Sequence, residues 1–122
     1  MGKRDWEVVK ATGTLGGGRR GNGEVCGALI GALASLGLKY SRASEEEKEN
    51  PIMFGYAIEF FKRFREEIVK NHSGIRCREI TGLDFSKPED VQVFYKGEKS
   101  VECTRIVGDT AKLVGEFLQR RT

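Results

Sequence analysis

The stretch VCGALIGALASLGL, residues 25–38, is the most apolar run of the chain and decides its fold. It is 14 residues long, whereas a membrane-spanning helix needs about 20 apolar residues. The run therefore predicts a buried helix, and we expect no membrane insertion. We place this helix over residues 23–36, with Asn22 as its cap and Gly37 as its C-terminal stop.

Further helices are expected on both sides of this run, and strand signals are weak. A short helix is predicted over residues 5–14, with residues 16–23 as a loop. Asn50 and Pro51 form a cap and first-turn pair that begins a long helix. Its apolar residues recur at steps of three and four, which is the period of a helix. They are Phe54, Ile58, Phe61, Phe64 or Arg65, and Ile68.

Two more helices are predicted in the second half of the chain. Ser86 and Glu89 have the spacing of a capping box, which marks a helix start. Ser100 is expected to open the last helix. Its predicted inward face is Cys103, Ile106 or Val107, Thr110, Leu113 or Val114, and Phe117. The pattern as a whole predicts an all-α fold, a small helical bundle with short connecting helices.

Composition limits the function classes. The 122 residues fit one domain over 1–122, with 39% hydrophobic and 32% charged residues. The formal net charge of +3 is small, and basic residues alternate with acidic ones in residues 62–67, so we expect no nucleic-acid partner. Residues 1–6 do not resemble a secretory signal. We therefore expect a cytoplasmic protein, in which cysteines stay reduced.

The glycine cluster before the apolar run has two readings. Residues 16–21 match the dinucleotide pattern G-x-G-x-x-G, but no convincing strand precedes them, so we favour a turn formed by Gly16, Gly17 and Gly18. Gly27 and Gly31 lie one turn apart on the same side of the predicted helix. Glycines inside a helix are unfavourable, and close approach of another helix or of a cofactor would compensate.

The three cysteines carry the chemical signal. Cys26, Cys77 and Cys103 each fall in the predicted first turn of a helix. Unpaired N–H groups there stabilise negative charge, and the thiolate is the reactive form of cysteine. Arg76 and Arg78 flank Cys77 and would add to this effect. The spacing lacks the local C-x-x-C signature of zinc ribbons and thioredoxins.

These residues resemble a known family, named for a C_GCAxxG_C_C cysteine pattern. The matching segments are the glycines at 16–18, the reading C-G-A-x-x-G at 26–31, the helix end at 36–40, and the segment at 77–82 with Cys103 after it. The resemblance implies a redox or metal-binding role centred on cysteines, with no established reaction or substrate. The family's first cysteine lies upstream in an N-terminal helix, but this chain has no cysteine before Cys26, and we expect that helix to be shortened.

Several hypotheses follow. In the first, Cys26, Cys77 and Cys103 converge and hold an iron–sulfur cluster or zinc, or exchange thiols and disulfides. The missing ligand would come from a second subunit, a small molecule or His72, although His72 is more simply a surface residue near a helix end. In the second hypothesis, the chain is a helical interaction module with core cysteines. Under both hypotheses, we expect a homodimer to cover the apolar helix at 23–36. The first hypothesis also includes a redox partner protein. Whether the chain is an enzyme stays open.

Overall fold

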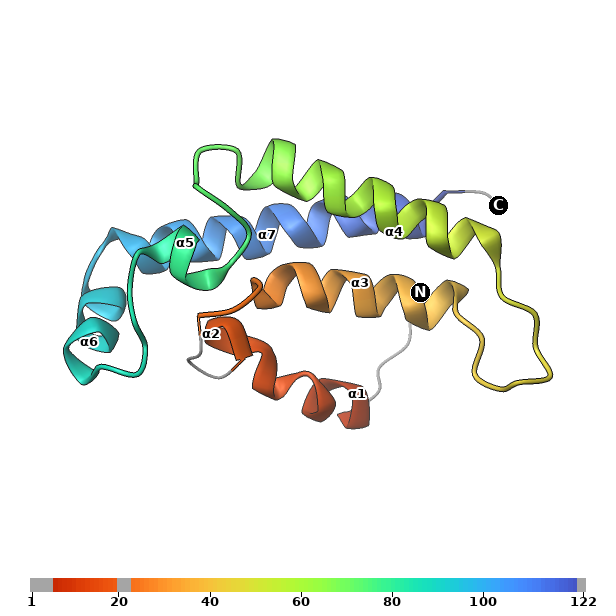
Figure 1. The fold of residues 1–122 in the computed structure, drawn as a ribbon, viewed down its shortest axis with the longest axis horizontal. Coiled ribbons are helices and arrows are strands. Elements are labelled where there is room, and N and C mark those ends of the chain that lie inside the picture. Colours follow the sequence, from red (N-terminus) through yellow and green to blue (C-terminus); the bar gives the residue numbers. More distant parts are fainter. Residues whose placement is uncertain (1–5, 20–22, 121–122) are drawn as a thin grey trace.

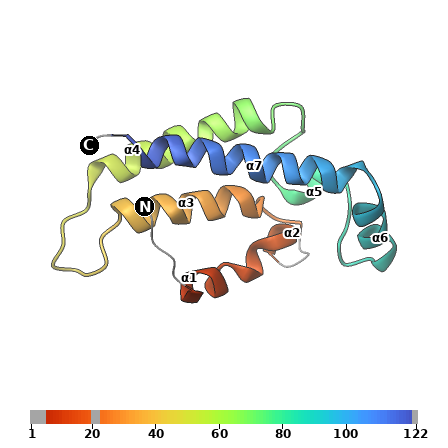
Figure 2. The same cartoon turned by 180° about the vertical axis from the view of Figure 1, so that it is seen from behind.

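Three long helices form the body of the molecule. The computed structural model describes residues 6–19 and 23–120. Helix α3 (Gly27–Tyr40) lies below the pair α4 (Pro51–Arg63) and α7 (Glu98–Leu118), and it packs against both (Figure 1). The view from behind shows the same arrangement, with α1 on the side of α3 opposite to α4 and α7 (Figure 2).

Short helices connect the long ones. At the N-terminal end they are α1 (Trp6–Ala11), the 3-10 turn η1 (Gly13–Leu15) and α2 (Gly16–Arg19). Between α4 and α7 they are the π-helical turn η2 (Phe64–Ile68), α5 (Cys77–Thr81) and α6 (Pro88–Lys96). The described residues contain no strand beyond one isolated β-bridge. The predicted all-α fold is confirmed. None of these helices is both long and apolar enough to cross a lipid bilayer, as far as the described residues extend.

The core lies where α3, α4 and α7 meet. Its largest fully buried side chains are Phe60, Phe64, Phe117, Leu29, Leu36, Ile106 and Val69. Aromatic rings from all three helices contact one another edge to face, with centroids 5.3–5.6 Å apart, in the pairs Tyr40–Tyr56, Tyr56–Phe117 and Phe60–Phe117. This geometry is favoured by the ring quadrupoles, so α3, α4 and α7 are joined by specific contacts as well as by burial.

An ion pair closes the core at the C-terminal end. Arg120 donates two hydrogen bonds to the carboxylate of Glu59, at 3.0 and 2.7 Å, and its guanidinium lies 3.8 Å from the centroid of Phe117. Paired hydrogen bonds of this kind are stronger than single ones. The end of the chain is thereby attached to α4.

The central helix is displaced from its predicted position. It begins at Gly27 with Cys26 as the N-cap and ends at Tyr40, so Gly37 lies inside the helix rather than at its end. The first helix is shorter than expected, and residues 16–19 are helical where a loop was predicted. The predicted cap, Asn22, lies outside the described residues. Apolarity identified the helix, but the glycines did not mark its boundaries.

The start of α4 is as predicted, but its buried face is predicted only in part. The side chain of Asn50 accepts a hydrogen bond from the Ile52 amide at 3.0 Å, as expected of a cap before Pro51. Phe54 and Ile58, expected to face inward, are 53% and 73% exposed, and Phe60 fills the core in their place, whereas Phe64 and Ile68 beyond the end of α4 are buried as predicted. Helix α4 therefore has two apolar faces, and the other three-and-four pattern is the buried one.

The last two helices begin differently from the prediction. Lys87, not Ser86, is the N-cap of α6, and no side chain caps it. Helix α7 begins at Glu98, after Gly97, so Ser100 lies within it. Its buried face contains Ile106, Thr110, Leu113, Val114 and Phe117, whereas the alternative Val107 is 52% exposed. The inward face of α7 was thus predicted correctly, and its first residue was not.

Candidate thiol site

Two backbone segments that are distant in sequence pair beside the start of α3. The Cys26 amide donates to the Ile75 carbonyl at 2.8 Å, and the Cys77 amide donates to the Glu24 carbonyl at 2.6 Å. These bonds flank an antiparallel bridge between Val25 and Arg76. The pairing fixes the first cysteine beside the second, although about fifty residues separate them in sequence.

Each cysteine lies at or near the start of a helix. Cys26 is the N-cap of α3 and Cys77 is the first residue of α5. Cys103 is the sixth residue of α7, in its second turn, so the prediction of a first-turn position is wrong for this residue. Cys26 is buried, Cys77 and Cys103 are half-buried, and all three are free thiols.

The three thiols influence one another electrostatically. The pKa of Cys77 is raised to about 11. Burial is the largest cause of this shift, and the neighbouring thiols of Cys26 and Cys103 contribute to it. Burial also raises the pKa of Cys103, with added contributions from Cys26 and from the Glu102 carboxylate. Each of the three pairs of thiols is therefore close enough for charge on one to disfavour charge on another. The structure brings all three predicted cysteines into one neighbourhood.

The direction of these pKa shifts is opposite to the predicted one. Desolvation disfavours the thiolate, and it outweighs any stabilisation by the short helix α5. The nearby arginines do not compensate, because their charges are directed to carboxylates. Arg76 and Arg78 each lie 4.0 Å from Glu24, and Arg105 pairs with Glu102. The expectation of depressed pKa values is wrong for Cys77 and Cys103.

Thr81 is a neighbour of Cys77 that the sequence analysis did not identify. Its buried hydroxyl donates to the Cys77 carbonyl at 2.9 Å and accepts from the Leu83 amide at 3.2 Å. The Thr81 side chain also lowers the pKa of Cys77, against the larger effects that raise it. The signal available in the sequence was a threonine four residues after the cysteine, one helical turn away.

Gly27 lies against a neighbouring element, whereas Gly31 meets none among residues 6–19 and 23–120. A Cβ atom at Gly27 would lie 2.5 Å from the Leu15 carbonyl oxygen, so η1 packs directly against the start of α3. Nothing lies within 4 Å of a Cβ at Gly31. A neighbouring element thus approaches α3 closely at Gly27, and at Gly31 no element of the described residues explains the glycine.

The glycine cluster before α3 forms a helical turn and not a phosphate loop. Gly16 and Gly17 lie in α2, and a Cβ at Gly16 would meet nothing within 4 Å. Gly18 has φ of +67° and a Cβ there would lie 2.3 Å from the Glu24 amide nitrogen, so only glycine fits. A 3-10 turn precedes these residues where a dinucleotide site would need a strand.

His72 pairs with a carboxylate. Its Nε2 lies 3.2 Å from Glu102 Oε1, and its side chain is 19% exposed, so it is not simply a surface residue. Arg105 binds the same carboxylate and also donates to the Ile68 carbonyl at 3.1 Å. Arg105 first, and His72 second, lower the pKa of Glu102 to about 2. His72 thus belongs to a hydrogen-bonded network that joins the end of η2 to α7.

The donor set does not fit a metal held by one chain. Among the described residues, no three His, Cys, Asp or Glu side chains are grouped closely enough to hold a metal ion. Tetrahedral zinc and iron–sulfur clusters are usually held by four protein ligands, and this chain has three cysteines in all. Thiol–disulfide chemistry needs two neighbouring sulfurs only.

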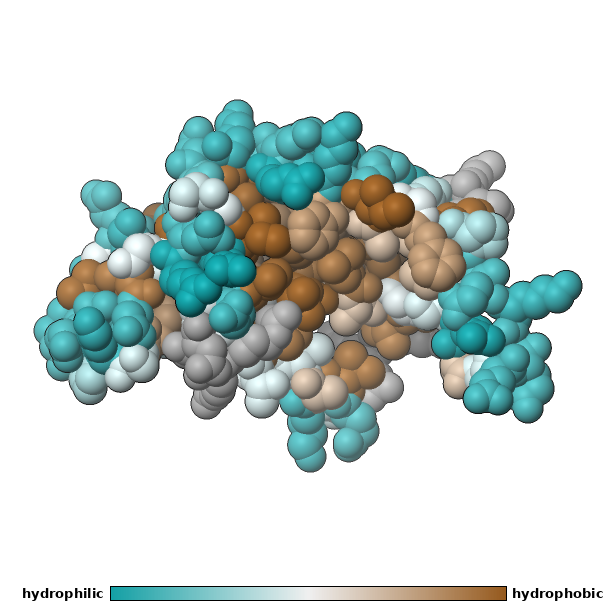
Figure 3. Space-filling view, viewed as in Figure 1, coloured by the Kyte–Doolittle hydropathy of each residue, from teal (hydrophilic) through white to brown (hydrophobic). Residues whose placement is uncertain are grey.

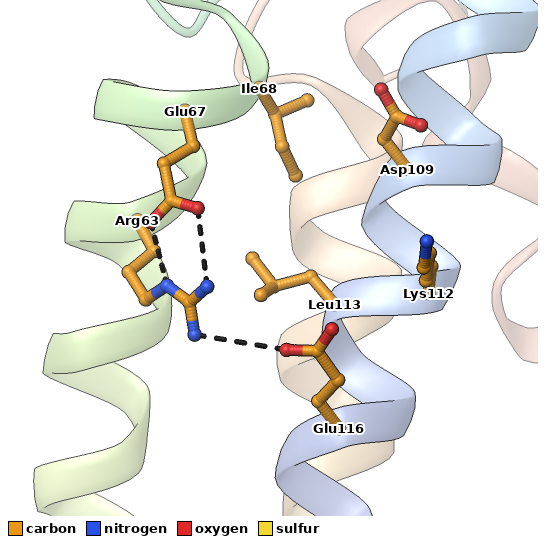
Figure 4. Close-up of a pocket in the computed structure, with 7 residues that line it drawn as sticks. All are labelled: Arg63, Glu67, Ile68, Asp109, Lys112, Leu113 and Glu116. Atoms are coloured by element: carbon orange, nitrogen blue, oxygen red, sulfur yellow. Dashed lines mark hydrogen bonds and ion pairs between the residues drawn. The ribbon is translucent and has the colours of Figure 1, made fainter.

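A separate shallow pocket lies between α4 and α7 (Figure 4). Its volume is about 250 Å³, and its walls are Arg63, Glu67, Ile68, Asp109, Lys112, Leu113 and Glu116. Arg63 is already paired with Glu67, at 2.7 Å, and lies 3.9 Å from Glu116. None of the cysteines lines this pocket. It is therefore not the predicted thiol site.

The fold and the site define a small all-helical protein with three neighbouring thiols. A family model described as "Putative redox-active protein (C_GCAxxG_C_C)" matches residues 1–117. The chain belongs to this family. No curated protein and no solved structure matches the chain. The family pattern reads G-C-A-x-x-G, whereas this chain reads C-G-A-x-x-G over residues 26–31, so Cys26 and Gly27 stand in the opposite order to the pattern. The Cβ position of Gly27 is closed by the Leu15 carbonyl.

Proposed function

We propose that the chain is a thiol redox protein in which Cys26 and Cys77 interconvert between two thiols and one disulfide, with Cys103 as a third thiol beside them. The observation that carries this proposal is the pairing of residues 23–26 with residues 75–78. Cys26 lies opposite Ile75 in this antiparallel pair, so Cys77 is its diagonal neighbour on the same face. Diagonal neighbours lie about 7–8 Å apart.

That separation is just beyond the range of a disulfide, in which the Cα atoms lie about 4.4–6.8 Å apart. A small movement of α5 toward α3 would bring the two sulfurs into bonding distance. Ile80 of α5 belongs to the same core as Cys26, so this movement would include a rearrangement of the packing around Ile80. The mutual influence of the thiols on their pKa values supports the same neighbourhood.

The proposed oxidant is the disulfide of a small thiol or of a partner protein. One protein thiolate attacks a sulfur of this disulfide, forms a mixed disulfide and releases one thiolate. The second protein thiol gives its proton to solvent, attacks the protein sulfur of the mixed disulfide and releases the other thiolate. The two cysteines together lose two electrons and two protons, and the two released thiols take them up.

We do not extend this proposal to zinc or an iron–sulfur cluster, because the described residues lack a group of three donors. We infer that the protein works in a reducing compartment, with the cytoplasm as the expected one. A redox partner protein and a homodimer complete the proposed function. Leu29 and Leu36 are buried within the chain, so these two side chains of α3 do not need a homodimer to cover them.

Equilibration of the protein with mixtures of reduced and oxidised glutathione tests the proposal. We expect the chain to lose two hydrogens and to yield a linked peptide pair containing Cys26 and Cys77, read by mass spectrometry after digestion. Cys26→Ser and Cys77→Ser should abolish this link, and Cys103→Ser is the matched variant that should retain it. A folded chain whose cysteines stay unlinked at every glutathione ratio would contradict the proposal.

A second candidate function is a helical interaction module with inert cysteines. The observation that favours it is that Cys26 belongs to the buried core, beside Leu29 and Ile80. Buried cysteine behaves as a small apolar residue. Under this alternative, glutathione leaves all three thiols unmodified, and Cys26→Ala changes stability without changing any thiol reaction.

A further inference from the structure

The cysteines of α5 and α7 lie on the inward sides of their helices. Cys77 lies one turn before Ile80, and Cys103 lies one turn before Ile106. Both isoleucines are buried in the core that also contains Cys26. The arginines on either side of Cys77 are exposed, and the surface over α5 is hydrophilic (Figure 3). The two half-buried thiols are therefore directed toward the core to which the buried thiol belongs.

Hydrogen bonds hold the segment from η2 to α5 against both α7 and α3. Arg105, two residues after Cys103, donates to the Ile68 carbonyl at 3.1 Å. Further along this segment, the Cys26 amide donates to the Ile75 carbonyl at 2.8 Å. Helix α5 follows at once, and Figures 1 and 2 show it beside the first turns of α7 and near the start of α3. The segment thus places the cysteine of α5 close to both of these helices.

The pKa values of the thiols agree with this placement. Burial is the largest cause that raises the pKa of Cys77, and the thiols of Cys26 and Cys103 are the next causes. Cys26 likewise contributes, after burial, to the raised pKa of Cys103. The described residues nevertheless contain no group of three donors that could hold a metal ion. The arrangement therefore favours thiols that bond in pairs, one pair after another.

The three thiols differ in their access to solvent. Cys26 is 9% exposed, whereas Cys77 and Cys103 are half-buried. A disulfide between Cys77 and Cys103, the outer disulfide, would have two sulfurs that an external thiol can reach. A disulfide between Cys26 and Cys77, the inner disulfide, would have one. Since thiol–disulfide exchange depends on access to the sulfurs, the outer pair suits exchange with a partner and the inner pair suits storage of the oxidised state.

We propose that Cys77 is shared between these two disulfides: the outer one exchanges with external thiols and disulfides, and the inner one then replaces it and protects the oxidised state. The proposal rests on the thiol–disulfide function proposed above and assigns a role to Cys103 within it. Rotation of the Cys77 side chain between staggered rotamers moves its sulfur relative to the other two. Together with the movement of α5, this rotation lets one sulfur bond either neighbour in turn.

Conversion of the outer into the inner disulfide is an internal exchange. The external disulfide has already taken up two electrons when the outer disulfide formed, by the steps given above. Cys26 gives its proton to solvent, and its sulfur attacks the sulfur of Cys77. The bond between Cys26 and Cys77 forms, the bond between Cys77 and Cys103 breaks, and Cys103 leaves as a thiolate that takes up a proton. A thiolate of high pKa is a poor leaving group, and the pKa of Cys77 is about 11, so Cys77 is retained in both disulfides.

Two cysteine variants, treated with oxidised glutathione beside the natural chain, test the proposal. A glutamate-specific protease places the three cysteines in separate peptides, so mass spectrometry identifies each linked pair. Cys26→Ala should form the outer disulfide, and glutathione should reduce it faster than the inner one. Cys103→Ser should reach the same inner disulfide as the natural chain, but several-fold more slowly. Thr104→Ala is the matched control, exposed and next to Cys103 on α7, and it should oxidise at the natural rate.

The outcomes separate this proposal from the proposed function. If the natural chain forms no linked pair, both fail. If the natural chain forms the inner disulfide while folded Cys26→Ala stays unlinked, only the shared role of Cys77 is overturned. The same holds if Cys103→Ser oxidises at the natural rate. Circular dichroism establishes that each variant is folded. The rate of Cys103→Ser, a change at a half-buried position, decides the question should Cys26→Ala not fold.

Discussion

The Cys77 thiol is expected to react slowly at neutral pH. Burial is the largest cause that raises its pKa to about 11, followed by the neighbouring thiols of Cys26 and Cys103. The sequence alone predicted the opposite, because Cys77 begins a helix. The rate of alkylation by iodoacetamide as a function of pH distinguishes these two expectations, since the thiolate is the form that reacts.

The size of the effect follows from the pKa. At pH 7.5 a thiol with a pKa of about 11 is ionised in roughly three molecules per ten thousand, against roughly one in eleven for free cysteine with a pKa of about 8.5. The thiolate population is thus about 300-fold smaller. A more basic thiolate is more nucleophilic, with a Brønsted slope of about 0.4–0.5, so the rate constant of the Cys77 thiolate is about tenfold larger than that of a free cysteine thiolate. We expect Cys77 to react about 20-fold to 30-fold more slowly than free cysteine.

Mass spectrometry of digested protein gives this rate for each cysteine separately. The Cys77 rate should keep rising with pH beyond 9, whereas the rate of free cysteine levels off. Cys26→Ser should lower the apparent pKa of Cys77 by removing a neighbouring charge. Thr81→Val should raise it by removing the hydroxyl that lowers the pKa of Cys77. A Cys77 rate that levels off below pH 8.5 would refute the reasoning from burial.

Three further substitutions test the packing and the ion network. Gly27→Ala should destabilise the fold by about 1–3 kcal/mol in urea unfolding, because its Cβ would lie 2.5 Å from the Leu15 carbonyl oxygen. In Gly31→Ala the new Cβ meets no neighbour among the described residues, so this variant should stabilise the fold by about 0.5–1 kcal/mol. Equal effects at both positions would contradict close packing at Gly27 alone. The pKa of Glu102 is lowered to about 2, chiefly by Arg105. The Glu102 carboxylate therefore stabilises the fold above about pH 4.5, and this contribution is lost as pH falls toward 2. Glu102→Gln should remove that part of the acid dependence of thermal unfolding, and an unchanged pH profile would count against it.

Local signals in the sequence predicted helices more reliably than they predicted helix faces. Asn50 and Pro51 fixed the start of α4, because a cap and a first-turn proline act on their own backbone. The face of α4 was not predictable in this way. Two apolar stripes share the helix, and which one is buried depends on where α3 and α7 lie. A single sequence does not contain that information, so Ile58 was assigned to the core in place of Phe60.

At the candidate site, too, local sequence signals were predictable and features that depend on the tertiary fold were not. The order of the cysteines and the glycines before α3 identified the family. The backbone pairing beside Cys26 was not predictable, because it joins segments far apart in sequence. The sign of the pKa shift at Cys77 was wrong for a related reason. Helix position can be read from the sequence, but burial depends on the tertiary fold.

The pairing of residues 23–26 with 75–78 has a consequence for the order of folding. Helices α3 and α4 are joined by a short connection and can associate early, whereas the bonds between Cys26 and Ile75 and between Cys77 and Glu24 close a loop of about fifty residues. Long loops are entropically costly to close, and their contacts form late. Short peripheral pairings also open before a packed core does. The amide hydrogens of Cys26 and Cys77 should therefore exchange with solvent deuterium sooner than those in the middle of α7.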